Sequence, residues 1–376
     1  MDRYVRELDR IGCNAASIMR QRSEDFETID ADPMFDMNLF LGPDDAAPTR
    51  QDAIRIFLAR WAALGLNKRP TANFYFRRPA PGFHPQVYAY ENSDAYDVAV
   101  VNPLAHFIRS GKPEGPWRHD VITPPLSGAA ATVDVNLRCA IHAHLYYPEL
   151  AADFLRKITV NQSRCDLLLS TSDHAKVRTL RTLTRDYDKG AVLIRLVPNR
   201  GRDIGAFLTA FAQDILGSYD VVGHLHGKRS LFIGDPAVGE SWREFLWQDL
   251  VGDLYPMMDI IINRFAADDG LGIVFPEDAH LSDWDFNRDI ATRLAQRMGI
   301  EGRLPPYFDF PIGTMFWART EALRPLFELK LDWPDYPEEP VPIDGTILHA
   351  LERLLPFAAR RAGYRYATSH ISGVTW

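Results

Sequence analysis

Cysteine is scarce in this chain, which has three cysteines in 376 residues. Cys13, Cys139 and Cys165 lie far apart, and no Cys-x-x-Cys pair occurs. Cys139 and Cys165 stand in apolar segments, where cysteine is ordinarily a buried free thiol. This spacing argues against a disulfide framework and predicts a reducing compartment.

Long apolar runs and the features of a signal peptide are also missing. The sequence has no run of about 18 apolar residues, the length that a membrane-spanning helix needs. Residues 1–9 carry acidic side chains and lack the apolar segment of a signal peptide. We therefore expect a cytoplasmic protein without a transmembrane segment, and peripheral association with the inner face of the cytoplasmic membrane stays open.

A surplus of basic residues is missing too. The formal net charge is -8, which argues against a nucleic-acid footprint over the whole chain, because such binding needs a basic face. We therefore expect no nucleic-acid partner. Four basic residues are nevertheless concentrated in one stretch: Arg200, Arg202, Lys228 and Arg229. Such local charge is compatible with a small phosphate ligand.

The first third of the sequence is expected to be mainly helical. Apolar residues recur at helical spacing in residues 1–29 and 50–66, and Thr49 can cap the second of these helices. A segment rich in proline and aromatic residues follows. We interpret its aromatic side chains as packing groups rather than as a stacking platform: Phe74, Tyr75, Phe76, Phe83 and Tyr88.

Residues 83–115 carry a compact helical pattern within this region. Pro103 suits the first position of a helix and Gly111 the position just past its end, and His106 is then a packed structural histidine on the inner side. The Phe-x-Pro-x-x-Tyr start and the later Asn-Pro-Leu-x-His-Phe run resemble a helical module that is attached to bacterial polysaccharide-synthesis enzymes.

A change of composition divides the chain. Residues 124–132 are rich in small residues and turn formers, which makes them the best candidate linker. We therefore expect a mainly helical N-terminal region at residues 1–125, with the module at 83–115, and a second domain at residues 132–376.

Strands and helices alternate from residue 138 onward. Apolar strand-like segments occupy residues 138–147, 164–172, 191–197 and 219–226, with helical segments between them. This alternation is typical of a doubly wound, mostly parallel sheet, so we predict an α/β fold. Polar groups that bind ligands in such folds gather at the carboxyl ends of the strands.

The turn at residues 199–205 follows one of these strands. Gly201 permits a positive φ or a close backbone approach, and Asp203 can cap the next helix, which leaves N–H groups available to an anion. Two arginines beside a helix start suit a nucleotide diphosphate, although arginines in turns are mostly solvated. The pattern is neither a Walker A loop nor Gly-x-Gly-x-x-Gly. The candidate donor-binding residues here are Asn199, Arg200, Gly201, Arg202 and Asp203.

Two His-x-His pairs lie at strand ends: His142 with His144, and His224 with His226. Residues two apart on a strand point to the same face, and a sheet of order 3-2-1-4 makes the first and fourth strands neighbours. The four histidines are therefore expected to converge. They suit a divalent metal, but histidines that hydrogen-bond near phosphates fit equally well. Two basic residues beyond the second pair are candidate diphosphate partners: Lys228 and Arg229.

Two later segments carry further candidates. Gly313 and Thr314 precede a strand and can bring the backbone close to a ligand. Asp344 opens a helix, where it is either an N-cap or, at the mouth of a cleft, the group that deprotonates a hydroxyl. Glu352 and Arg353 are interpreted as an ion pair or as surface charges.

Taken in order, these segments resemble the rhamnan synthesis protein F family over about residues 138–370. The resemblance rests on five segments: His142 to Tyr147, Asn199 to Ile204, His226 to Ser230, Gly313 to Arg319 and Asp344 to Arg353. It implies a glycosyltransferase with a GT-A-like fold that acts in bacterial cell-surface polysaccharide synthesis. It also implies a nucleotide-sugar donor, with dTDP-rhamnose as the expected example, and an oligosaccharide or lipid-linked glycan as acceptor.

One departure from the wider GT-A pattern concerns the metal. The strand that usually carries Asp-x-Asp for a divalent cation here ends in His224-Leu225-His226. We therefore favour a reaction without a metal or other cofactor, in which Arg202, Lys228 and Arg229 neutralise the diphosphate. If a divalent metal is bound, the four histidines are its candidate ligands. In an inverting transfer, Asp344 would take the proton of the acceptor hydroxyl.

Two other functions are compatible with the sequence. A degenerate domain of this type would bind a glycan or act as a scaffold without catalysis, and the histidine pairs would suit a metal-dependent hydrolase. A transferase is expected to be stabilised by a nucleotide and a scaffold is not, so nucleotide binding distinguishes the two. Metal analysis of the purified protein tests the hydrolase.

Overall fold

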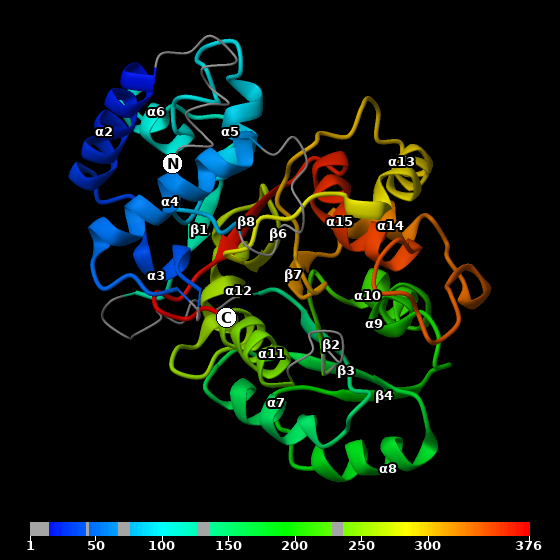
Figure 1. The fold of residues 1–376 in the computed structure, drawn as a ribbon. Coiled ribbons are helices and arrows are strands. Elements are labelled where there is room, and N and C mark those ends of the chain that lie inside the picture. The colour runs from blue at the N-terminus through cyan, green and yellow to red at the C-terminus, as the bar shows by residue number, and fades with distance from the viewer. Residues whose placement is uncertain (1–14, 43–44, 67–75, 126–135, 228–235) are drawn as a thin grey trace.

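The computed structural model describes residues 15–42, 45–66, 76–125, 136–227 and 236–376. Within these ranges one eight-stranded sheet has helices packed on both faces (Figure 1). Its strands are β1 (Asp120–Ile122), β2 (Cys139–His144), β3 (Asp166–Thr171), β4 (Val192–Leu196), β5 (Val221–His226), β6 (Leu271–Pro276), β7 (Phe316–Arg319) and β8 (Arg365–Ser369). The order is β1-β8-β6-β7-β5-β2-β3-β4, and only the pairings of β7 with β5 and β6 are antiparallel among these strands. The predicted α/β fold with a mostly parallel sheet is confirmed.

The half of the sheet formed by β4, β3, β2 and β5 has the predicted order 3-2-1-4. Strands β2, β3 and β5 are buried along nearly their whole length, as parallel strands covered on both faces are. The strand predicted at 138–147 is shorter, because the pairing of β2 with its neighbours ends at His144. The connecting helical segments are α7 (Leu150–Thr159), α8 (His174–Leu183), α9 (Arg202–Gly205), the π-helical turn η2 (Ala206–Ala210) and α10 (Ala212–Ser218).

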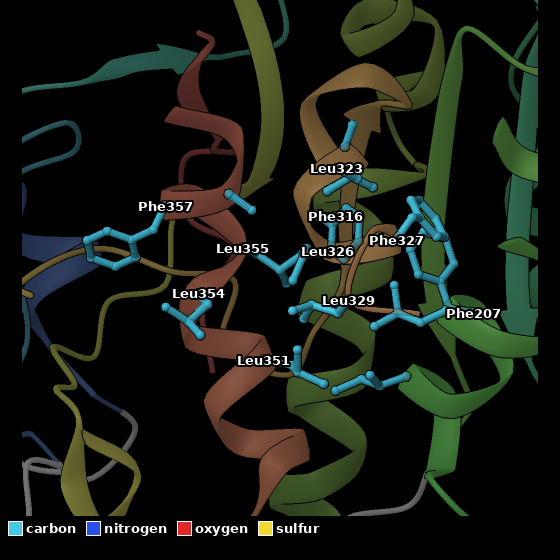
Figure 2. Close-up of a cluster of buried hydrophobic side chains, with 14 of the residues drawn as sticks. Phe207, Phe316, Leu323, Leu326, Phe327, Leu329, Leu351, Leu354, Leu355 and Phe357 are labelled. Carbon is cyan, nitrogen blue, oxygen red and sulfur yellow. The ribbon is translucent and has the colours of Figure 1, made fainter. Parts of the chain in front are cut away.

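Two apolar layers cover the two faces of the sheet, and both extend over its second half, which is formed by β7, β6, β8 and β1. On one face, Figure 2 shows Leu351 and Leu355 of α15 directed toward Leu326 of α14 and Phe316 of β7. On the other face, α7, α11 and α12 form the second layer. Burying one such side chain contributes about 1.5–3 kcal/mol, so these layers fix the helices on the sheet. The helical segments of this half are α11 (Pro236–Leu250), α12 (Met257–Ala267), η3 (Asp285–Asn287), α13 (Arg288–Arg297), η4 (Glu321–Leu323), α14 (Arg324–Phe327), η5 (Trp333–Asp335) and α15 (Ile347–Arg361).

The N-terminal part is helical, as predicted. Its helices are α2 (Ala15–Ala31), α3 (Met37–Phe40), α4 (Arg50–Leu66), α5 (Pro85–Glu91) and α6 (Pro103–Arg109). Phe76, Phe83 and Tyr88 are buried in the core that these helices share, which confirms their packing role. Residues 1–14, with Cys13, and the aromatic pair Phe74 and Tyr75 lie outside the described residues. Among the described helices, none is both long and apolar enough to cross a bilayer.

The predicted helical pattern at 83–115 is confirmed in its main features. Pro103 begins α6, Asn102 caps it, and Gly111 follows its end with a φ of 78°. His106 stacks on Tyr96 with ring centroids 4.0 Å apart, and its Nδ1 lies 2.8 Å from the Tyr88 hydroxyl. His106 is therefore a packed structural histidine.

Main chain and buried charges join the N-terminal part to the sheet. Strand β1 pairs with β8, and Arg78 lies 2.9 Å from Glu277 and 2.6 Å from Asp309. His119 contacts the same two carboxylates, at 2.8 Å and 3.4 Å. Most of the predicted linker lies outside the described residues, so the division into two domains stays a prediction.

Candidate active site

A cavity of about 520 Å³ lies at the carboxyl edge of the parallel strands. Its lining comes from the start of α9, the end of β5, α11, the loops after β6 and before β7, and the start of α15. The chain reverses its direction across the sheet between β2 and β5, and doubly wound sheets bind ligands beside such a switch point. Six predicted site residues line this cavity: Arg202, Asp203, His226, Gly313, Thr314 and Asp344.

The remaining predicted residues are placed differently. Three belong to the turn before α9 but not to the cavity lining: Asn199, Arg200 and Gly201. Three are buried in the sheet next to the cavity: His142, His144 and His224. Two lie outside the described residues, so their role stays a prediction: Lys228 and Arg229.

The turn at residues 199–205 is built against the segment at 334–341. Gly201 has a φ of 72°, and a Cβ at this position would lie 2.8 Å from the ring of Tyr336. Arg200 donates from Nε to the Tyr336 carbonyl at 2.7 Å. The predicted helix cap is wrong, because the Asp203 carboxylate faces His224 Nε2 at 3.2 Å and makes no cap hydrogen bond.

Replacing Gly201 by alanine should destabilise the protein by more than about 1 kcal/mol, because the methyl group meets Tyr336 and the φ is positive. Gly217→Ala in α10 is the matched control. Nothing lies within 4 Å of a Cβ there, and alanine favours a helix over glycine by roughly 0.5–1 kcal/mol. Urea unfolding of both variants measures the difference, and equal stabilities would contradict this account of the turn.

Arg202, unlike Arg200, lines the cavity. Its Nε lies 3.4 Å from Glu339, and its Nη2 donates to the Val341 carbonyl at 3.2 Å. Both contacts are longer than the roughly 2.7–2.9 Å of strong charge-assisted hydrogen bonds. An anion in the cavity would therefore compete only with weak contacts for this guanidinium group.

Gly313 and Thr314 form a tight turn in the cavity wall, with φ values of 88° and 58°. A left-handed conformation is rare for a β-branched residue and persists where the surroundings fix it, often at functional sites. The Gly313 N–H donates to Glu352 Oε1 at 2.6 Å, and the Gly313 carbonyl accepts from His226 Nε2 at 2.7 Å. The main chain is thus held at the cavity from both sides.

Glu352 and Arg353 line the cavity, so their interpretation as surface charges is wrong. Burial raises the pKa of Glu352, and the nearby Arg353 and the hydrogen bond from Gly313 offset this only in part. Arg353 lies 3.6 Å from Glu352 and donates to Asp285 at 2.7 Å. The pair is therefore a buried feature of the site.

Asp344 does not cap α15, because Thr346 holds that position. Its carboxylate accepts from Asn287 Nδ2 at 2.6 Å and from the Phe286 N–H at 3.3 Å. Burial acts to raise the pKa of Asp344, but the Asn287 hydrogen bond and Arg353 outweigh it, and the pKa lies below its ordinary value. Asp344 is thus ionised at the cavity wall.

Sequence reasoning missed an aromatic part of the lining. Trp376 packs against Trp242 and His280, with ring centroids 5.3 Å and 4.5 Å away. Phe286 lines the cavity and is 84% exposed. These residues come from separate segments and share no motif. The start of α15 did carry a signal, because Leu348, His349, Glu352 and Arg353 have the spacing of one helix face.

The histidine pairs converge as predicted, with His142 opposite His224 and His144 opposite His226 in the sheet. The Nδ1 atoms of His142 and His224 lie 2.9 Å apart. Among the described residues, no group of three or more His, Cys, Asp or Glu is arranged to hold a metal ion. The ring nitrogens of His142, His144 and His224 form hydrogen bonds with one another, with Ser170 and with Asp203.

An α/β fold with a cavity of this kind at the carboxyl edge of its strands, lined by apolar side chains and a few charged ones, is typical of ligand-binding and catalytic domains. Residues 88–364 match the family model described as Rhamnan synthesis protein F, and the chain belongs to this family. The family description links the chain to polysaccharide synthesis.

Two similar proteins come from Xanthomonas campestris pathovar campestris, strains B100 and ATCC 33913, and both are named uncharacterized protein WxcX. Each is 28% identical to this chain over 89% of this chain and 47% of the relative. The chain thus spans about half the length of the curated relatives it matches.

Proposed function

We propose that the protein transfers a sugar from a nucleotide-diphosphate donor to a glycan acceptor inside this cavity, in the manner of a GT-A-like glycosyltransferase. The observation that carries the proposal is the position of the cavity, which lies at the switch point of the sheet in a member of a rhamnan synthesis family. A volume of about 520 Å³ is in the range of small-molecule sites. We take dTDP-rhamnose as the donor, on the family description.

In this proposal, basic side chains neutralise the charge of the donor diphosphate. Arg202 lines the cavity with weak contacts, so a phosphate oxygen can replace them. Lys228 and Arg229 follow closely after His226 in the sequence and stay candidate diphosphate partners. The proposal keeps the reaction without a metal that the sequence favours, with Arg202, Lys228 and Arg229 as the cationic partners of the diphosphate.

Two carboxylates compete for the role of proton acceptor. Asp344 is the acceptor that the sequence predicts, but its lowered pKa makes it a weak base. Glu352 has a raised pKa and is held in place by the strained turn at Gly313. A general base works best when its pKa is near the working pH, so we propose Glu352.

The reaction balances without a cofactor. The acceptor oxygen forms a bond to the anomeric carbon while the bond from that carbon to the diphosphate oxygen breaks. Glu352 takes the acceptor proton, and Arg202 stabilises the charge on the departing nucleotide diphosphate.

Nucleotide-sugar binding tests the proposal directly. A concentration of dTDP-rhamnose at 100 times its Kd should stabilise the protein by about 2.7 kcal/mol, which a thermal shift detects. Arg202→Ala should remove most of this shift, whereas Arg200→Ala, in the same turn but outside the lining, should keep it. A screen of other nucleotide sugars by donor hydrolysis extends the test to the donor. The transferase proposal fails, in favour of a scaffold, if no nucleotide sugar raises the thermal stability of the protein and the protein hydrolyses none of them.

A further inference from the structure

A continuous chain of polar side chains runs from the cavity into the sheet. Asp203 lines the cavity, and its Oδ2 lies 3.2 Å from His224 Nε2. His224 Nδ1 is 2.9 Å from His142 Nδ1, and His142 Nε2 is 3.2 Å from Ser170 Oγ. The same hydroxyl is 2.9 Å from His144 Nδ1. These groups belong to α9 and to the adjacent strands β5, β2 and β3.

The donor and acceptor atoms of each group allow only one direction for this series of hydrogen bonds. An ionised Asp203 only accepts, so His224 carries its proton on Nε2 and, as a neutral ring, accepts at Nδ1. The Nδ1 of His142 must then donate, and its Nε2 must accept from the Ser170 hydroxyl. The Ser170 oxygen in turn accepts from His144 Nδ1. Every hydrogen bond therefore points toward Asp203.

The surroundings favour the neutral forms of His142 and His144. His142 and His224 are fully buried, with parallel rings that pack against Phe207. Burial lowers the pKa of His142 well below its ordinary value and lowers that of His144 to about 4. Burial acts to raise the pKa of Asp203, but His226 and the hydrogen bond from His224 outweigh it and hold that pKa below its usual range. Within the part of the protein that the structure describes, three other titratable groups interact with this hydrogen-bonded chain: His226, Lys176 and Glu352.

We propose that this chain of histidines and serine is a positioning device that holds Asp203 ionised and fixed at the cavity, as the acceptor of a hydrogen bond from a ligand hydroxyl. The identity of the ligand rests on the proposed function, in which the hydroxyl belongs to the donor sugar. An ionised carboxylate repels phosphate oxygens. Asp203 therefore marks the sugar end of the donor site, and Arg202 marks the diphosphate end.

Nitrogen-15 NMR of the whole protein chain with labelled histidine tests the direction of these hydrogen bonds without any ligand. At about pH 7 we expect neutral rings, with the proton on Nε2 of His224 and on Nδ1 of both His142 and His144. A charged His142, or a His224 ring with its proton on Nδ1, would overturn the inference.

Ser170→Ala interrupts the chain of hydrogen bonds at a residue far from the ligand, and Thr171→Val is the matched control. Thr171 is the next residue of β3, is fully buried, and its hydroxyl has no hydrogen-bond partner among the described residues. Ser170→Ala should move part of the His224 signal toward the Nδ1-protonated form. Thr171→Val should leave that signal unchanged, and a signal that responds equally in both variants would show a general packing effect and overturn the inference.

Comparing the affinities for dTDP-rhamnose and dTDP tests whether Asp203 binds the sugar end of the donor. Ser170→Ala should weaken dTDP-rhamnose about tenfold and dTDP by less than about twofold, because only the sugar reaches Asp203. Unchanged affinity, or an equal loss for both ligands, would overturn the assignment of Asp203 to a sugar hydroxyl. A wild-type protein that binds neither ligand would refute the proposed function, and the tautomer pattern would still decide whether the positioning chain exists.

Discussion

Replacing Glu352 by glutamine should lower the rate of sugar transfer by about two to four orders of magnitude, with little change in donor affinity. Glutamine keeps the size of the side chain and an oxygen that accepts the Gly313 N–H, but it cannot take the acceptor proton. Release of dTDP in the presence of the glycan acceptor measures the rate. Thermal unfolding of the variant checks that the fold is intact.

Asp344→Asn is the matched comparison, and the pH profile separates the two carboxylates. The pKa of Glu352 lies above its ordinary 4.5, and that of Asp344 lies below its ordinary 3.8. A carboxylate accepts a proton only when ionised. With Glu352 as the base, the rate should fall as the pH drops through a value above 4.5. A rate that stays constant down to 3.8, together with a larger loss in Asp344→Asn, would assign the proton to Asp344 instead.

Arg78→Met should lower the free energy of unfolding by about 3–5 kcal/mol, the cost of removing one partner from a buried ion pair. Arg78 lies within 2.9 Å of Glu277 and 2.6 Å of Asp309, and at most 5% of each of the three side chains is exposed. Methionine fills part of the same space but leaves two buried carboxylates without their arginine. Glu277 keeps His119 and the Gly82 N–H, and Asp309 keeps His119 and the Tyr366 hydroxyl. Urea unfolding at neutral pH measures this loss.

Arg55→Met provides the control, because Arg55 pairs with Asp52 at 2.9 Å but is 62% exposed. Exposed pairs contribute about 0–1 kcal/mol, so equal losses in the two variants would contradict the role of the buried cluster. Burial acts to raise the pKa of Glu277, but Arg78 and His119 lower it to about 2. Its contribution to stability is therefore complete above pH 4.5 and is lost as the pH falls toward 2. Arg78→Met should reduce this acid dependence.

Local structure, and the face of a strand on which a residue lies, follow from the order of residues alone. The apolar runs of β2, β3 and β5 identify buried parallel strands, and the period of two residues places both histidines of each pair on one face. Helix α4 has the predicted bounds of 50–66. Pro103 and Gly111 delimit α6, as the sequence predicts. These features depend on neighbours within a few positions, so the order of residues is enough to specify them.

Which groups meet at the cavity depends on contacts between segments that are far apart in the sequence. Asp203 sits at a helix start, where a cap is the local expectation, yet it faces His224 from a strand later in the chain. The sequence predicts an ion pair or surface charges at Glu352 and Arg353, whereas α15 places the Glu352 carboxylate against the Gly313 N–H at the cavity. Trp242 and Trp376 meet across more than a hundred positions of sequence. Such contacts depend on how the helices pack on the sheet. Packing joins distant residues by shape and burial, which no local spacing encodes.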